Sequence, residues 1–198
     1  MATRYDYDLL VLGGGAAGLT VAAGAARLGV KTLLVEREAR LGGDCLHFGC
    51  VPSKTLLATA HARSLLARAR DFGLPEVPAP PVDFAAVRRR IETVVAAIQE
   101  HDSPERFTRL GADVRFGEAR FRDDHTVVLD GRRVSADRIV VATGSRAAVP
   151  AIPGLAEAGY LTNREIFSLE ALPESLVILA AGPWPWRWGR RFHAWAAA

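Results

Sequence analysis

A glycine-rich turn near the N-terminus constrains the fold more than any other part of the sequence. Residues 7–12 form a short apolar run typical of a buried parallel strand, and residues 13–18, GGGAAG, lead from it into an alanine-rich helical stretch that ends near Gly29. Glycines at the first, third and sixth positions permit a tight turn, a close backbone approach to a pyrophosphate and close packing of helix on strand. This order of elements predicts a dinucleotide-binding fold.

An acidic residue follows where such a fold needs one. Residues 31–35 predict the next strand, which ends at Glu36, 18 residues beyond Gly18. A carboxylate there accepts hydrogen bonds from an adenosine ribose. It also disfavours a 2'-phosphate, although Arg37 and Arg40 lie close enough to leave that choice open. The alternative to a nucleotide site is a glycine-rich turn without a ligand.

The two cysteines of the chain lie together in residues 42–54, GGDCLHFGCVPSK. A disulfide between Cys45 and Cys50 closes so small a loop that its stabilisation falls at the low end of the usual roughly 2–4 kcal/mol. Cys50 lies at the predicted start of a helix, where the helix dipole and Lys54, one turn further on, stabilise a thiolate. We therefore interpret the pair as a redox centre.

Two other interpretations of these cysteines exist. One is a buried, inert pair, and the other is a zinc site formed by Cys45, His47, Cys50 and His61. Neither accounts for the glycines before the pair or for the Pro-Ser-Lys after it, and zinc ligands usually have a tighter spacing. His47 could also assist proton transfer, but a packed or solvated loop histidine is the simpler interpretation.

Together these segments resemble the class I pyridine nucleotide-disulfide oxidoreductases, a family that includes dihydrolipoamide dehydrogenase, glutathione reductase and mercuric reductase. The resemblance covers residues 5 to about 182 and includes a second block, ATGS at 142–145 and PAIPG at 150–154. It implies a Rossmann-like α/β domain with a parallel sheet, an inserted helical pair and a small antiparallel β meander. It also implies FAD as cofactor and NAD(P)H as electron donor.

The resemblance assigns roles to individual residues. Cys50 would lie against the flavin, Cys45 would exchange with substrate, and Lys54 would stabilise the reduced flavin, so these three form the predicted catalytic set. No metal is expected. The residues predicted to bind the cofactor are Gly13, Gly15, Ala16, Ala17, Gly18, Glu36, Arg37, Gly42, Gly43, Asp44, Lys54, Ala119, Ala142, Thr143, Gly144 and Ser145.

The motif departs from its commonest form at two places. Asp44 stands where threonine is frequent, and His47-Phe48 stands where Asn-Val is frequent. The pattern therefore looks more like a mercuric-reductase-like branch of uncertain substrate than like lipoamide dehydrogenase. Mercury itself is not supported, because the chain has no further cysteine pair to bind it. We expect a small-molecule disulfide or similar acceptor.

The domain organisation predicted from the sequence has three parts. Residues 1–150 form the FAD-binding domain, with a redox helix at 45–70, a helical insertion at 83–110 and a β meander at 113–135. Residues 151–179 connect it to the first strand, at 176–179, of a truncated NAD(P)-binding domain. Residues 180–198 form an aberrant tail, in which all four tryptophans of the chain lie.

The resemblance stops abruptly after Leu179. A frame shifted by one base can encode GGGPMALEMGQAF from that point, a glycine-rich turn followed by a helix, so we expect a single-base deletion there. The alternative is a genuine divergent C-terminus. We expect an incomplete fragment that is inactive unless complemented, and homodimerisation, a property of the resembling family, would lack its segment here. The alternatives are a flavin-binding or thiol redox-sensing module, and a nonfunctional product of a broken gene.

Charge and hydropathy narrow the classes of partner. The chain has 25 basic and 22 acidic residues, and Arg187, Arg190 and Arg191 alone equal its formal charge of +3. The high pI therefore comes from the arginines of the tail, and no nucleic-acid surface is predicted. Glycines interrupt the apolar start, and neither a leader peptide nor a membrane span is indicated. We expect a cytoplasmic protein.

Overall fold

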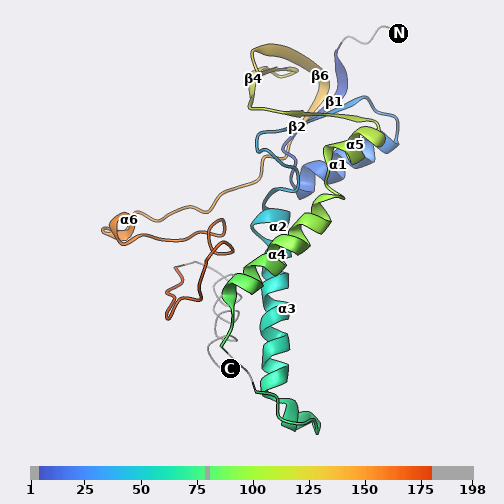
Figure 1. The fold of residues 1–198 in the computed structure, drawn as a ribbon. Coiled ribbons are helices and arrows are strands. Elements are labelled where there is room, and N and C mark those ends of the chain that lie inside the picture. Colours follow the sequence, from blue (N-terminus) through green and yellow to red (C-terminus); the bar gives the residue numbers. More distant parts are fainter. Residues whose placement is uncertain (1–4, 79–80, 180–198) are drawn as a thin grey trace.

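The computed structural model describes residues 5–78 and 81–179. Its centre is a six-stranded sheet with the order β3-β2-β1-β6-β5-β4 (Figure 1). Four neighbouring strands are parallel, namely β3 (Ala112–Phe116), β2 (Thr32–Glu36), β1 (Tyr7–Leu12) and the second half of β6 (Arg132–Val141). β5 (Thr126–Leu129) and β4 (Ala119–Asp123) continue the sheet in antiparallel pairing. The predicted α/β fold with a parallel sheet is confirmed.

Both faces of the central strands are buried, which explains why β1 and β2 are continuous apolar runs. One face packs under α1 (Ala16–Arg27) and α5 (Pro104–Arg109), where Val11 and Leu34 join Leu19 and Phe107 in one cluster. The opposite face places Leu10 and Leu33 in a second cluster with apolar side chains of β5 and β6. The sheet is therefore a rigid support for the turns at its edge.

The prediction of an antiparallel meander over 113–135 is wrong for its first strand. β3 pairs in parallel with β2, in a register that runs from Thr32 with Ala112 to Glu36 with Phe116. The helical crossover through α4 and α5 explains the difference, because such crossovers return the chain parallel to the strand it left. The antiparallel part begins at β4.

β6 belongs to both the antiparallel and the parallel part of the sheet. Its first four residues pair antiparallel with β5, and from Ala136 onward it pairs in parallel with β1. Ala136 is fully buried at the junction, which keeps the strand continuous. Asp130 and Gly131 form the hairpin turn between β5 and β6, and both have a positive φ, 49° and 77°.

The cysteine segment forms two helices instead of the single helix predicted over 45–70. Cys45 lies on α2 (Gly43–His47), and Cys50 is the first residue of α3 (Cys50–Ala67), which the 3₁₀ turn η1 (Ala69–Phe72) follows. A Cβ on Gly49 would lie only 2.7 Å from the Asp44 carbonyl oxygen, so glycine is needed where the two helices meet. The predicted start of a helix at Cys50 is confirmed.

The insertion contains the two predicted helices. α4 (Phe84–Gln99) begins at the Asp83 cap, whose carboxylate accepts a hydrogen bond from the Ala86 N–H at 3.1 Å. α5 begins in the same way at Ser103, which accepts from the Arg106 N–H at 3.3 Å. In Figure 1 α4 lies along α3, and the two helices share a buried cluster that includes Leu56, Phe84 and Ile91.

The chain after β6 runs away from the sheet to the short helix α6 (Leu155–Ala158) and then returns to the α3–α4 pair (Figure 1). The buried strand predicted at 176–179 is not formed. These residues have no strand partner, and Val177 is 85% exposed, because no neighbouring strand in the described residues covers them. The predicted tail and frameshift lie outside the described residues.

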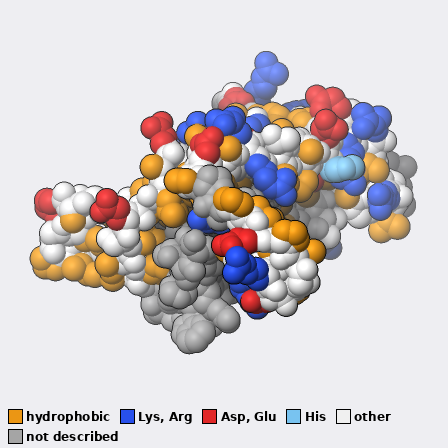
Figure 2. Space-filling view, turned by 60° about the horizontal axis from the view of Figure 1, so that its bottom comes forward, with side chains coloured by type: hydrophobic (Ala, Val, Ile, Leu, Met, Phe, Trp, Pro, Cys, Tyr) orange, Lys and Arg blue, Asp and Glu red, His pale blue; other side chains and the backbone are white. Residues whose placement is uncertain are grey.

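Surface charges of both signs are mixed. On the face shown in Figure 2, Lys and Arg side chains alternate with Asp and Glu and with hydrophobic groups. Within residues 5–78 and 81–179, no helix is long and apolar enough to cross a membrane.

Candidate functional site

The two glycine-rich turns of the sequence contact each other at the carboxyl ends of β1 and β2. The Gly42 N–H donates to the Gly14 carbonyl at 2.8 Å, and Gly15 and Gly42 form an isolated parallel bridge. Gly43 has φ of 57°, and a Cβ on it would lie 2.7 Å from the Gly15 Cα. The two turns therefore form a backbone surface without side chains, which we call the cradle. A side chain at these glycines would fill the space between the turns.

The first turn is also packed tightly beneath the cradle. A Cβ on Gly18 would lie 1.8 Å from the Gly13 carbonyl oxygen, and one on Gly13 would lie 2.3 Å from the Ala142 carbonyl oxygen. The close helix-to-strand packing expected at Gly18 is therefore present. Gly13 has φ of 108°, a conformation that only glycine adopts readily.

Glu36 is hydrogen-bonded to the first glycine-rich turn. Its carboxylate is buried and accepts hydrogen bonds from the Gly14 N–H at 2.5 Å and from the Glu38 N–H at 2.7 Å. The sequence suggested a ribose contact, which stays a prediction. The structure adds a local role, since two backbone N–H donors fix the position of the Glu36 side chain beside the turn.

The remaining predicted cofactor residues approach the same edge of the sheet. Ala142 follows β6 and donates its N–H to the Leu12 carbonyl at 2.8 Å, and Gly144 has φ of 71°. Ala119 begins β4, just after the turn at Gly117, whose N–H donates to the Glu36 carbonyl at 2.8 Å. Parallel pairing brings these segments together, because the carboxyl ends of parallel strands share one edge.

The two thiols lie at the junction between α2 and α3. Both cysteines are reduced; Cys45 is partly buried and Cys50 is exposed. Burial, and then the hydrogen bond and negative charge of the Cys50 sulfur, raise the pKa of the Cys45 thiol, while Lys54 opposes this. The Cys45 sulfur therefore keeps its proton to a higher pH than an ordinary thiol.

This environment predicts slow alkylation of Cys45 in the reduced protein. Because the thiolate is the nucleophile, labelling with short pulses of iodoacetamide should reach half its maximal rate at a higher pH for Cys45 than for N-acetylcysteine. The Lys54→Gln change should move the Cys45 midpoint higher still. Mass spectrometry of the Cys45 peptide measures both. A midpoint at or below that of N-acetylcysteine would contradict the assignment.

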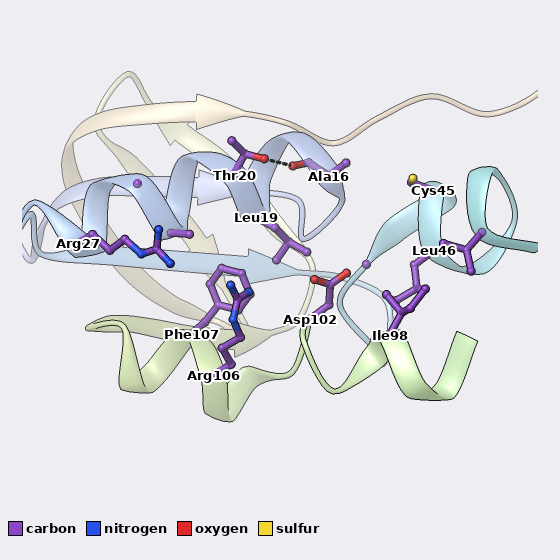
Figure 3. A pocket seen from close by; sticks show the side chains of 14 residues that line it. Ala16, Leu19, Thr20, Arg27, Cys45, Leu46, Ile98, Asp102, Arg106 and Phe107 are labelled. Carbon is purple, nitrogen blue, oxygen red and sulfur yellow. Dashed lines mark hydrogen bonds between the residues drawn. The ribbon is translucent and has the colours of Figure 1, made fainter. Parts of the chain in front are cut away.

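A pocket of about 500 Å³ opens beside Cys45. Its walls come from α1, α2 and the α4–α5 region, and Figure 3 shows Leu19, Phe107 and Asp102 around the space between them. Burial raises the pKa of the Asp102 carboxyl. Cys45 lines this pocket and Cys50 does not.

The described residues give the zinc interpretation no ligand set. No three His, Cys, Asp or Glu side chains in this part of the chain come together as metal ligands. The His47 ring instead bonds the Leu41 carbonyl through Nε2 at 2.9 Å.

A charged cluster beside the cradle escaped the sequence analysis. Glu38 lies within 4.0 Å of Arg37, Arg146 and Arg164, and Arg164 also lies 3.8 Å from Asp44. Arg164 is about 120 positions from Asp44, and no motif marks it. The apolar pair Ile166 and Phe167 could have indicated that this segment packs on the domain, since both are buried against α3 and α4.

The comparisons with known proteins agree with this geometry. The family described as pyridine nucleotide-disulphide oxidoreductase matches residues 7–184. A mercuric reductase of Staphylococcus aureus is 33% identical over 95% of this chain and 34% of its own length, and a dihydrolipoyl dehydrogenase of Acholeplasma laidlawii is 33% identical over 89% and 53%.

A solved structure shares the fold. The HOCl-induced flavoprotein disulfide reductase RclA from Escherichia coli superposes with a TM-score of 0.78 at 26% identity, over 95% of this chain and 40% of that protein. The chain thus spans about a third to a half of the relatives named here. Members of the matching family are oxidoreductases that bind FAD and use NAD(P)H. With its sheet, paired glycine turns and adjacent dithiol, the chain belongs to the pyridine nucleotide-disulphide oxidoreductase family.

Proposed function

We propose that this chain is the FAD-binding part of a disulfide oxidoreductase, in which the Cys45–Cys50 pair relays electrons from flavin to a small-molecule disulfide or similar acceptor. The observation that carries the proposal is the contact between the two glycine turns, since the second turn leads directly into α2 and Cys45. The second turn of the cradle and the dithiol are thus parts of one continuous segment.

The residues at the cradle fit a dinucleotide diphosphate. Glycines 13, 15, 18, 42 and 43 leave the backbone bare, and the N-terminus of α1 adds unpaired N–H groups and a positive dipole end. Ala16 and Ala17 open that helix, Ala142 and Thr143 lie next to Gly13, and Gly144 and Ser145 follow them in sequence. Glu36 and Arg37 would hold the ribose side, and Ala119 would lie near the adenine.

FAD, once reduced by NAD(P)H, would supply the electron pair that the disulfide accepts. The chain's own groups then control where protons and charge reside. Cys50 is exposed at the start of α3, and we assign it to the flavin side. Lys54, one turn later, adds a cation on that side. Cys45 lines the pocket and Cys50 does not, so an acceptor would reach Cys45 first.

The electron donor and the assembly are part of the same proposal. In the relatives, NAD(P)H binding and homodimer formation would depend on parts that this chain does not match, since it covers 34% of the length of one relative and 53% of the other. The exposed apolar side chains of residues 176–179 would suit the first strand of a nucleotide-binding domain. We expect the protein to act in the cytoplasm.

A glycine substitution tests the cradle. Gly43→Ala places a Cβ 2.7 Å from Gly15 at a positive φ of 57°, so we expect FAD affinity to fall at least about tenfold as the turns separate. The matched control is Gly73→Ala, which has a similar φ of 72° but nothing within 4 Å. Titration of protein with FAD, followed by quenching of flavin fluorescence, measures both. Equal affinities for the two variants, or no FAD binding to the parent protein, would refute the proposal.

A further inference from the structure

Arg164 connects a late segment of the chain to the rim of the cradle. Its guanidinium lies 3.6 Å from the Glu38 carboxylate and 3.8 Å from that of Asp44, and it covers the Phe48 ring with a centroid distance of 4.8 Å. Next to it, Asn163 donates to the Phe48 carbonyl at 3.3 Å. Two further contacts therefore hold this segment where Arg164 meets α2.

The Asp44 carboxylate lies beside the proposed diphosphate site. It lies in the first turn of α2, next to Gly42 and Gly43, whose backbone forms half of the cradle. A carboxylate there repels a diphosphate, and Glu38 adds a second negative charge nearby. Arg37, Arg146 and Arg164 all pair with Glu38, and Arg164 also pairs with Asp44. Three arginines and two carboxylates give the cluster one net positive charge. Removal of Arg164 would make it neutral and would leave Asp44 without its cation.

We propose that Arg164 is a cofactor-affinity residue, which neutralises Asp44 and supplies positive charge to the diphosphate of the bound dinucleotide. This inference rests on the proposed FAD site. Among the three arginines, Arg164 contacts both carboxylates and is the least exposed, at 35% of its side chain. A partly buried guanidinium is less screened by salt than a surface one, so its charge acts more strongly on a neighbouring anion.

The test compares ligands with and without phosphates. FAD, ADP and adenosine are titrated into the full chain and its variants at low salt, with calorimetry as the readout. Arg164→Gln should weaken FAD and ADP about tenfold and leave adenosine within about twofold, because adenosine carries no phosphate. Arg164→Lys keeps the charge and should recover most of the loss. The deficit of Arg164→Gln should shrink at high salt, as expected for a charge effect.

Two further variants separate charge from structure. Arg133→Gln removes the same charge from an exposed position near the start of β6, eight residues before its end, and should leave all three affinities unchanged. In an Asp44→Asn background, the carboxylate that Arg164 compensates is gone. Arg164→Gln should then reduce the free energy of FAD binding by less than half of what it does in the parent background. Unchanged melting temperatures without ligand would show that the segment remains docked.

The outcomes separate this inference from the proposed function. Absence of FAD and ADP binding in the parent chain would overturn both. Normal FAD binding in the parent with an Arg164→Gln affinity equal to that of Arg133→Gln would overturn only the role of Arg164. Equal losses for adenosine and ADP would also overturn it, since they would show that Arg164 only supports the local structure.

Discussion

Gly18→Ala is expected to lower the free energy of unfolding by about 3 kcal/mol and to abolish measurable FAD binding. The added Cβ would lie 1.8 Å from the Gly13 carbonyl oxygen and 3.3 Å from the Val11 side chain. Neither backbone can yield, because β1 is hydrogen-bonded on both sides and α1 is packed on it. Overpacking of this kind costs about 1–3 kcal/mol, and the upper end applies because the clash is with backbone.

A second glycine on the same helix provides the matched control. Gly24 also lies within α1, but nothing lies within 4 Å of the Cβ that alanine would add. Gly24→Ala should therefore stabilise the chain by about 0.5–1 kcal/mol through helix propensity alone. Urea unfolding followed by circular dichroism measures both changes. A Gly18→Ala chain as stable as the Gly24→Ala chain would show that α1 does not approach β1 this closely.

Local patterns predicted much of the site, because its main parts are contiguous in sequence. The strand, turn and helix around Gly13 follow directly from glycine spacing and hydrophobic periodicity. The caps at Asp83 and Ser103 and the hairpin at Asp130 follow from residue chemistry within a few positions. Each of these depends on short-range hydrogen bonds, which the sequence alone specifies.

The features that the sequence analysis missed depend on long-range packing. Whether residues 112–116 join the meander or the parallel sheet is decided by the α4–α5 crossover, and the strand itself looks the same in both cases. The separate helix α2 is only five residues long, and the close approach of Gly49 to the Asp44 carbonyl divides it from α3. Arg164 reaches Asp44 only because Ile166 and Phe167 bury themselves against α3 and α4.

The role of the dithiol predicts a large effect of its removal. If the Cys45–Cys50 disulfide accepts electrons from bound flavin, Cys45→Ser should remove that disulfide. The flavin would then be the only electron acceptor in the protein. Thiol-disulfide exchange needs an attacking thiolate and a resolving partner, so this variant should also lose catalysed exchange with small disulfides. FAD affinity should not change, because Cys45 is not one of the glycines that form the cradle.

The same chain allows a chemical control. Blocking the reduced parent protein with N-ethylmaleimide modifies its two cysteines, the only ones in the sequence, without any mutation. The blocked protein should behave as Cys45→Ser does. Exchange with small disulfides that survived the blocking would show that the two thiols are not its route.

The most direct test of the account is an anaerobic dithionite titration of the oxidised, FAD-loaded chain. A flavin and a disulfide each take two electrons, so we predict about four electron equivalents per FAD for the parent and about two for Cys45→Ser. The flavin absorbance should bleach completely in both proteins. A parent protein that takes up about two equivalents, as its variant does, would contradict the claim that the flavin and the Cys45–Cys50 pair form one redox unit.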